Sequence, residues 1–189
     1  MKSVLVRIAL PALLLVCQFA LAQASRTVFL VRNAEASSAA PNAPLSLAGE
    51  RRAECLARTL GDAGIKQIYV SEAKRTQQTA DPLAKRLKLT PSTVASKDVS
   101  SLVRNILYGT GGNVLVVSSS DVLPVLTQRM QAGKIKPIAE NEFDQIFMIT
   151  VTEGVGSPVT TLRYCEAPIS NASAGPEGKR PVIQAAKLP

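Results

Sequence analysis

The 189-residue chain contains no histidine and no tryptophan, and aromatic residues make up only 4% of it. Without histidine it lacks the commonest metal ligand and the usual general base near neutral pH. The acidic residues also lack the spacing of a calcium-binding loop. No basic cluster is interleaved with aromatic side chains, which argues against a surface that stacks nucleic-acid bases. We therefore expect no metal, no cofactor and no nucleic-acid partner.

Long apolar runs are also scarce, and the clearest one is at the amino terminus. Lys2 and Arg7 precede an apolar stretch from Ile8 to Leu21, and Ala22-Gln23-Ala24 follows it as a small-x-small cleavage site. This order is typical of a secretory signal peptide, here residues 1–24. The stretch is short for a membrane span and no second one follows. We expect a periplasmic or secreted protein with no stable membrane insertion after signal cleavage.

Cysteine and charge give weaker indications. After signal cleavage only Cys55 and Cys165 remain, in a compartment that permits disulfides. Two alternatives stay open: the two cysteines pair, or Cys55 is a small buried side chain on the apolar face of a helix. The net charge is +8 for the whole chain, and +6 once Lys2 and Arg7 are removed. A basic excess attracts anions in general without identifying one.

Apolar periodicity predicts alternating strands and helices. Strands are expected over residues 27–31, 67–70 and 114–117, because these are short, nearly continuous apolar runs. Helices are expected at four places, each with a boundary signal: from Ser46 to about Leu60, from Arg75 to Leu87, from a cap at Asp98 to Leu107, and from Asp121 to Gly133.

Such alternation predicts an α/β fold with three layers, in which a mostly parallel central sheet has helices on both faces. Residues 145–152 and 159–165 alternate in the manner of strands and predict a C-terminal hairpin at one edge. We expect one domain over residues 25–165. Residues 166–189, with four prolines among small polar residues, are expected to form a flexible tail.

Ligands of open α/β sheets bind beyond the carboxyl ends of the strands. Arg32 and Asn33 leave the first predicted strand there, and Arg75 follows the second. Arginine offers a planar fork of donors that suits phosphate oxygens. Two alternatives stay open for each arginine: it binds an anion such as phosphate beyond the sheet, or it forms a surface salt bridge.

Three serines, Ser118, Ser119 and Ser120, leave the third predicted strand just before a helix. Their hydroxyls and backbone amides can bind an anion at the helix N-terminus, and capping of that helix by Ser120 or Asp121 is the alternative.

Three segments carry a family resemblance: Phe-Leu-Val-Arg-Asn-Ala-Glu at 29–35, Ser-Glu-Ala-Lys-Arg-Thr-Gln-Gln-Thr-Ala at 71–80, and Val-Leu-Val-Val-Ser-Ser-Ser-Asp at 114–121. Together and in this order they resemble the histidine phosphatase superfamily, also called the phosphoglycerate mutase-like fold. The resemblance spans residues 27–165. In that family a phospho-accepting histidine follows the arginine of the first segment, and a second histidine ends the third strand. Asn33 and Ser119 stand at these two places.

The resemblance implies that Arg32 and Arg75 clamp phosphate and that both catalytic histidines are replaced. A neutral imidazole nitrogen attacks phosphorus in the family, whereas the carboxamide of Asn33 offers no such lone pair. The family also uses a carboxylic acid to protonate the leaving group. Asp98 is the candidate here, with helix capping as the alternative.

These observations predict a catalytically inactive pseudophosphatase that binds phosphate or a phosphorylated ligand. The predicted site comprises Arg32, Asn33, Arg75 and the serines at 118–120. Two alternatives remain: a weak phosphomonoester hydrolase with a non-histidine mechanism, and a scaffold for a protein partner.

Overall fold

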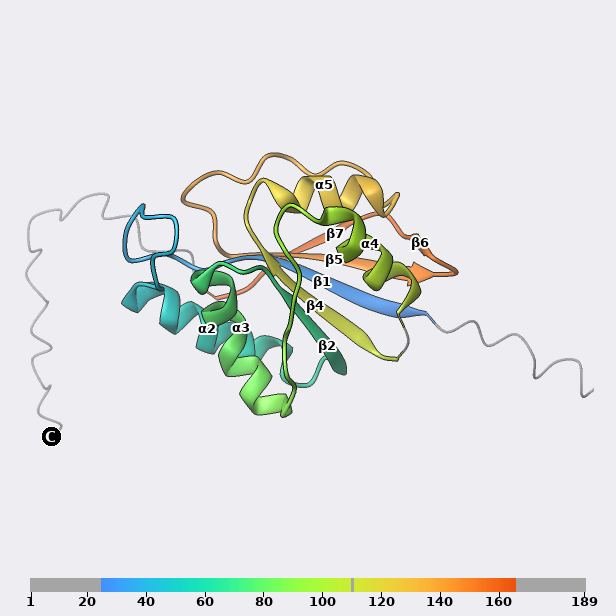
Figure 1. Ribbon diagram of the computed structural model, residues 1–189. Coiled ribbons are helices and arrows are strands. Elements are labelled where there is room, and N and C mark those ends of the chain that lie inside the picture. Colours follow the sequence, from blue (N-terminus) through green and yellow to red (C-terminus); the bar gives the residue numbers. More distant parts are fainter. Residues whose placement is uncertain (1–24, 110, 166–189) are drawn as a thin grey trace, which may run out of the picture.

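A central β-sheet forms the middle layer of the computed structural model, which describes residues 25–109 and 111–165 (Figure 1). The predicted signal peptide and tail lie outside the described residues. The strand order is β3-β2-β4-β1-β5-β6, and β7 also pairs with β5. The strands are β1 (Arg26–Arg32), β2 (Ile65–Val70), β3 (Ser92–Thr93), β4 (Asn113–Ser118), β5 (Gln145–Thr152), β6 (Val155–Gly156) and β7 (Thr160–Arg163).

The first four strands across the sheet run parallel, and the last ones run antiparallel. β4 pairs in parallel with both β1 and β2, and β2 pairs in parallel with β3. β5 lies antiparallel to β1, and β6 and β7 lie antiparallel to β5. The mostly parallel sheet and the C-terminal hairpin at its edge are therefore confirmed.

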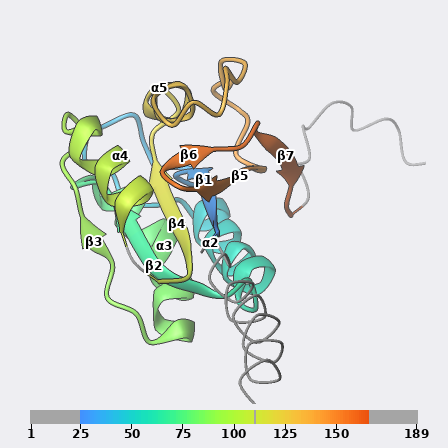
Figure 2. The same ribbon diagram turned by 90° about the vertical axis from the view of Figure 1, so that its right-hand side faces the viewer.

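Helices cover both faces of the sheet, as the two views show (Figures 1 and 2). They are α2 (Leu47–Leu60) and α3 (Lys74–Leu87) on one face, and α4 (Val99–Tyr108) and α5 (Val122–Arg129) on the other. None of the helices in the described part of the chain combines the length and apolarity that crossing a lipid bilayer requires.

Two of the expected helix caps are present. Ser46 Oγ accepts a hydrogen bond from Gly49 N at 3.1 Å, and Asp98 Oδ1 accepts one from Ser101 N at 3.0 Å. Each bond satisfies an otherwise unpaired amide at the start of its helix. The expected extent of α5 is wrong: the helix ends at Arg129 and the side chain of Asp121 makes no capping bond. Its end is set by Gln131, whose φ of 59° turns the chain before Gly133.

The sheet is buried on both faces, which explains the continuous apolar runs in the sequence. Val28 and Leu30 of β1 pack in the core under α4 and α5. Phe29 and Val31, pointing the other way, pack in the core under α2 and α3.

The two cysteines of the domain form a disulfide. Cys55 of α2 is bonded to Cys165, two residues after β7, with the two Cα atoms 6.2 Å apart. Pairing is therefore the alternative that the structure supports. The bond ties α2, in the layer that it forms with α3, to the end of the C-terminal hairpin.

Candidate functional site

The carboxyl ends of β1, β2 and β4 meet at one edge of the sheet, at the end where the loop before α2 lies (Figure 1). Arg32 of β1 is in register with Ser118 of β4, and Asn33 N donates to Ser118 O at 2.8 Å. A cavity of about 390 Å³ opens at this edge. Its lining residues are Pro41, Asn42, Ser71, Glu72, Ala73, Arg75, Thr76, Ser96 and Ser119.

Arg75 supplies a guanidinium group to the cavity from the first turn of α3. The side chain is half-buried, and its Nη1 donates to Pro41 O at 3.2 Å. The loop before α2 is held against the same helix end, since Lys74 N donates to Asn42 Oδ1 at 3.0 Å. The sequence-based assignment of Arg75 to this edge agrees with its place in the structure.

Arg32 is held by a segment far away in the sequence. Its Nη1 donates to the backbone carbonyls of Ala139, Glu140 and Glu142 at 2.7, 3.0 and 3.1 Å. Its guanidinium carbon lies 4.1 Å from the ring centroid of Phe143, a cation–π arrangement. Arg32 is not among the residues that line the cavity. Within the described part of the chain, its Nε and Nη2 make no hydrogen bond.

The two arginines nevertheless influence one another. Burial lowers the pKa of Arg32, and the positive charge of Arg75 lowers it further. Glu140 and Glu35 oppose that shift. Both positive charges therefore act at this edge, where an anion between them would be stabilised.

Asn33 is buried directly after β1. Its side chain is 6% exposed, and Nδ2 donates to the adjacent Ala34 O at 3.0 Å. Ala34 N in turn donates to Thr79 Oγ1 at 2.9 Å, which ties the end of β1 to α3. The carboxamide thus holds the backbone and does not line the cavity.

Of the three serines, only Ser119 lines the cavity. Ser118 is 3% exposed as the last residue of β4, and Ser120 is half-buried outside the lining. Ser119 O accepts from Val122 N and Leu123 N at 3.2 and 3.4 Å, so its backbone, rather than a side chain of Ser120 or Asp121, satisfies the first amides of α5.

Glu72 is a cavity residue that the sequence-based site did not include. Its Oε1 accepts from Ser96 Oγ at 2.7 Å and its Oε2 from Ser96 N at 2.8 Å. The backbone N–H of Glu72 itself, followed by the hydroxyl and N–H of Ser96, holds the pKa of this carboxyl below its ordinary value. Glu72 is therefore an anion at neutral pH. Its position beside the arginine motif was the only sequence signal for it.

Asp98, the candidate acid, caps α4 and lies outside the cavity lining. Hydrogen bonds from the backbone N–H and hydroxyl of Ser101 lower the pKa of its carboxyl. A lowered pKa favours the ionised form, which cannot donate a proton.

A largely buried ion pair joins Glu35, just after β1, to Arg52 of α2. Glu35 accepts from Arg52 Nε at 2.9 Å and from Arg52 Nη2 at 2.6 Å, and Arg52 is 6% exposed. The guanidinium carbon of Arg52 is also 6.0 Å from the Phe143 ring that stacks on Arg32. Phe143 therefore contacts both guanidinium groups, and neither the pair nor the stack is encoded by a local pattern.

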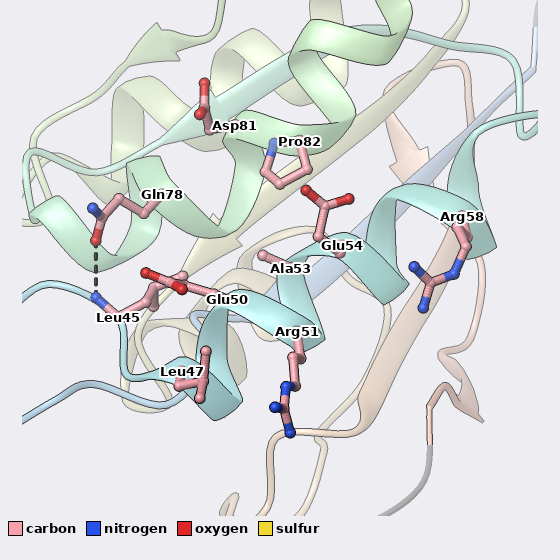
Figure 3. A pocket seen from close by; sticks show the side chains of 10 residues that line it. All are labelled: Leu45, Leu47, Glu50, Arg51, Ala53, Glu54, Arg58, Gln78, Asp81 and Pro82. Atoms are coloured by element: carbon pink, nitrogen blue, oxygen red, sulfur yellow. Dashed lines mark hydrogen bonds between the residues drawn. The ribbon is translucent and has the colours of Figure 1, made fainter.

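A second cavity, of about 660 Å³, lies between α2 and α3 (Figure 3). Leu45, Ala53 and Pro82 give it an apolar part, while Glu50 and Asp81 add carboxylates. It contains none of the residues predicted for the site. Among the described residues, no group of three or more His, Cys, Asp or Glu side chains is placed to hold a metal ion.

The fold has three layers, with Arg32 at the end of β1, Arg75 after β2 and a cavity at the carboxyl ends of these strands, and it is of the phosphoglycerate mutase-like class. The model of the histidine phosphatase superfamily (branch 1) matches residues 28–98. The chain is similar to this superfamily over that segment.

Solved structures with this fold are similar over most of their length. The protein histidine phosphatase SixA complexed with tungstate has 22% identity and a TM-score of 0.60, with 72% of this chain and 96% of that chain covered. A putative α-ribazole-5′-P phosphatase from Escherichia coli K-12 has 16% identity and a TM-score of 0.59, covering 73% and 96%. A putative phosphohistidine phosphatase SixA from Nakamurella multipartitia has 18% identity and a TM-score of 0.53, covering 76% and 98%. No curated protein sequence matches the chain.

Proposed function

We propose that this chain is an exported pseudophosphatase that binds phosphate or a phosphorylated ligand without hydrolysing it. One observation carries the proposal: the chain has no histidine, while Arg75 and Ser119 line a cavity where ligands of such sheets bind. The anion-binding groups are thus present without the nucleophile that the family uses.

The reaction chemistry supports inactivity. Hydrolysis of a phosphate monoester requires one of the largest barrier reductions known among enzymes. The amide of Asn33 is no nucleophile, and it is engaged with Ala34 O. A serine nucleophile at Ser119 would need a base, and the carboxylate that lines the cavity, Glu72, is a weak one because its pKa is lowered.

The arrangement of donors supports binding. Arg75 is at the cavity, and Arg32 lies nearby with Nε and Nη2 still able to donate. A guanidinium fork matches the geometry of a phosphoryl group. Tungstate, which the SixA structure contains, is a tetrahedral oxyanion like phosphate, so the same fold accommodates such a group in that protein.

The disulfide supports export. Disulfides persist in oxidising compartments and are rare in the cytosol. The bond between Cys55 and Cys165 therefore agrees with the signal-peptide pattern of residues 1–24. The two observations together support the proposed periplasmic or secreted location.

The first prediction tests binding through thermal stability. Phosphate should raise the melting temperature of the purified protein, because a ligand that binds only the native state adds about 2.7 kcal/mol at 100 times its Kd. Sodium chloride at equal ionic strength corrects for screening. Arg75→Ala should lose the shift, whereas Arg58→Ala, which removes an exposed charge from α2, should keep it. An equal shift in wild type and Arg75→Ala would contradict the site.

The same preparations test inactivity. Release of product from an aryl phosphate should be no higher for wild type than for Arg75→Ala. Turnover that disappears in Arg75→Ala but survives in Arg58→Ala would identify an active phosphatase and overturn the proposal.

A further inference from the structure

Two opposite charges face the candidate cavity without pairing. Glu72 and Arg75 both line it, yet no salt bridge joins them in the described structure. Each is held by a different neighbour: the carboxylate by Ser96 N and Oγ, and the guanidinium by Pro41 O. The cavity therefore presents a fixed anion and a fixed cation to whatever enters it.

A simple phosphate ion engages only part of this lining. Arg75 attracts it, while Glu72 repels it from within the same 390 Å³ space. A ligand that also carries an ammonium group binds more favourably, since the carboxylate of Glu72 attracts the ammonium. The space of about 390 Å³ is large compared with the roughly 30 Å³ that one water molecule occupies in the liquid, so it has room for a small ligand with both groups.

We propose that the cavity binds a phosphate monoester of a primary amine, with the phosphoryl group at Arg75 and Ser119 and the ammonium group at Glu72. This inference rests on the proposed function, because it names the class of ligand for the same site. The phosphoryl group is recognised by the guanidinium fork and the Ser119 hydroxyl. The ammonium group pairs with a carboxylate that no salt bridge in the described structure engages, although the positive charge of Lys97 also acts on it.

Two probes that differ in one group test the ligand class. Phosphoethanolamine carries the ammonium, and ethyl phosphate is its counterpart without it. Isothermal titration of the wild-type protein should give a Kd for phosphoethanolamine about fivefold lower, since a partly exposed ion pair contributes up to ~1 kcal/mol. The ammonium reduces the net negative charge of the ligand, so general attraction to this basic protein favours ethyl phosphate. A preference for phosphoethanolamine must therefore come from a specific contact.

Glu72→Gln identifies the group that recognises the ammonium. In this variant the preference should disappear or reverse, and ethyl phosphate should bind more tightly than to wild type because a repulsive charge is gone. Asp62→Asn is the matched control: it removes one exposed carboxylate just before β2, at the opposite edge of the sheet, and should keep the wild-type ratio. Circular dichroism establishes that all three proteins are folded.

The outcomes separate the two proposals. If wild type binds ethyl phosphate as tightly as phosphoethanolamine, the ligand class is wrong and phosphate binding stands. If Glu72→Gln keeps the preference, Glu72 does not recognise the ammonium. If neither probe binds to wild type, the proposed function fails together with the inference.

Discussion

Tyr164 has a buried hydroxyl group with no hydrogen-bond partner in the described part of the chain. Its side chain is 4% exposed and lies near the charged groups of Arg52, Glu35 and Asp144. Burial raises the pKa of Tyr164 far above its ordinary value of 10.0, and the positive charge of Arg52 opposes the shift without cancelling it. Because Tyr164 keeps its proton in the folded state, the free energy of unfolding depends on pH in the alkaline range.

The second prediction follows from that linkage. Above pH 10 the unfolded chain releases the tyrosine proton while the folded chain retains it, so the free energy of unfolding should fall as the pH rises. Tyr164→Phe should remove this part of the alkaline loss and should change stability little at pH 7, because the hydroxyl makes no hydrogen bond. Urea unfolding between pH 7 and 11 measures both effects. An unchanged pH profile in Tyr164→Phe would show that Tyr164 does not titrate abnormally.

At the scale of single elements, Asn113 links the start of β4 to β1 and to the loop before β2. It begins β4, and its Oδ1 accepts from Thr27 N of β1 at 2.8 Å. Its Nδ2 donates at 2.7 Å to Ala63 O, just before β2. One side chain thus pairs backbone groups of both neighbouring chain segments and helps to fix the register of β4 between them.

The third prediction concerns this link. Asn113→Ala should lower the free energy of unfolding by about 2 kcal/mol, because two hydrogen bonds worth ~1 kcal/mol each are lost and their backbone partners are left unpaired. Asn105→Ala, a change of the same type in α4, should stay within about 0.5 kcal/mol, since its side chain makes no hydrogen bond to the described residues. If both variants lost the same free energy of unfolding, the two hydrogen bonds of Asn113 would not contribute to stability as predicted.

Elements that bury apolar residues could be predicted from the sequence, and those fixed by long-range pairing could not. The runs at 27–31 and 114–117 indicated β1 and β4 because strands covered on both faces are almost continuously apolar. The two-residue strands β3 and β6 could not be predicted, because Ser92–Thr93 and Val155–Gly156 are too short to show an alternation of apolar and polar residues.

In the candidate site too, features with a local sequence pattern could be predicted and features fixed by long-range contacts could not. The position of Arg75 followed from its place after a strand and at the start of a helix. The bonds from Arg32 to Ala139 and Glu140 join residues more than a hundred positions apart, and no local pattern encodes them. Glu72 was missed because its role depends on the neighbouring loop that brings Ser96 to its carboxylate.

At the scale of the whole molecule, the disulfide closes a loop over most of the domain. The fourth prediction is that Cys55→Ser, Cys165→Ser lowers the free energy of unfolding by roughly 4–5 kcal/mol, the value expected when a loop of this size is opened in the unfolded chain. The separation of the two cysteines is 110 residues. Urea unfolding of the variant, and of wild type with and without a reductant, measures the change. A variant as stable as oxidised wild type would contradict this contribution.

The disulfide also determines how the chain would respond to tension. Residues 55–165 form a covalently closed ring, and β1 lies outside that ring although it is inserted between β4 and β5. A force applied at the two ends would act through the sulfur bridge and extract β1, while the ring itself could not lengthen. About 385 Å of contour length, at ~3.5 Å per residue, would stay hidden until the bridge was reduced. A single oxidised molecule stretched in a force spectrometer should therefore extend only by the segments outside the ring.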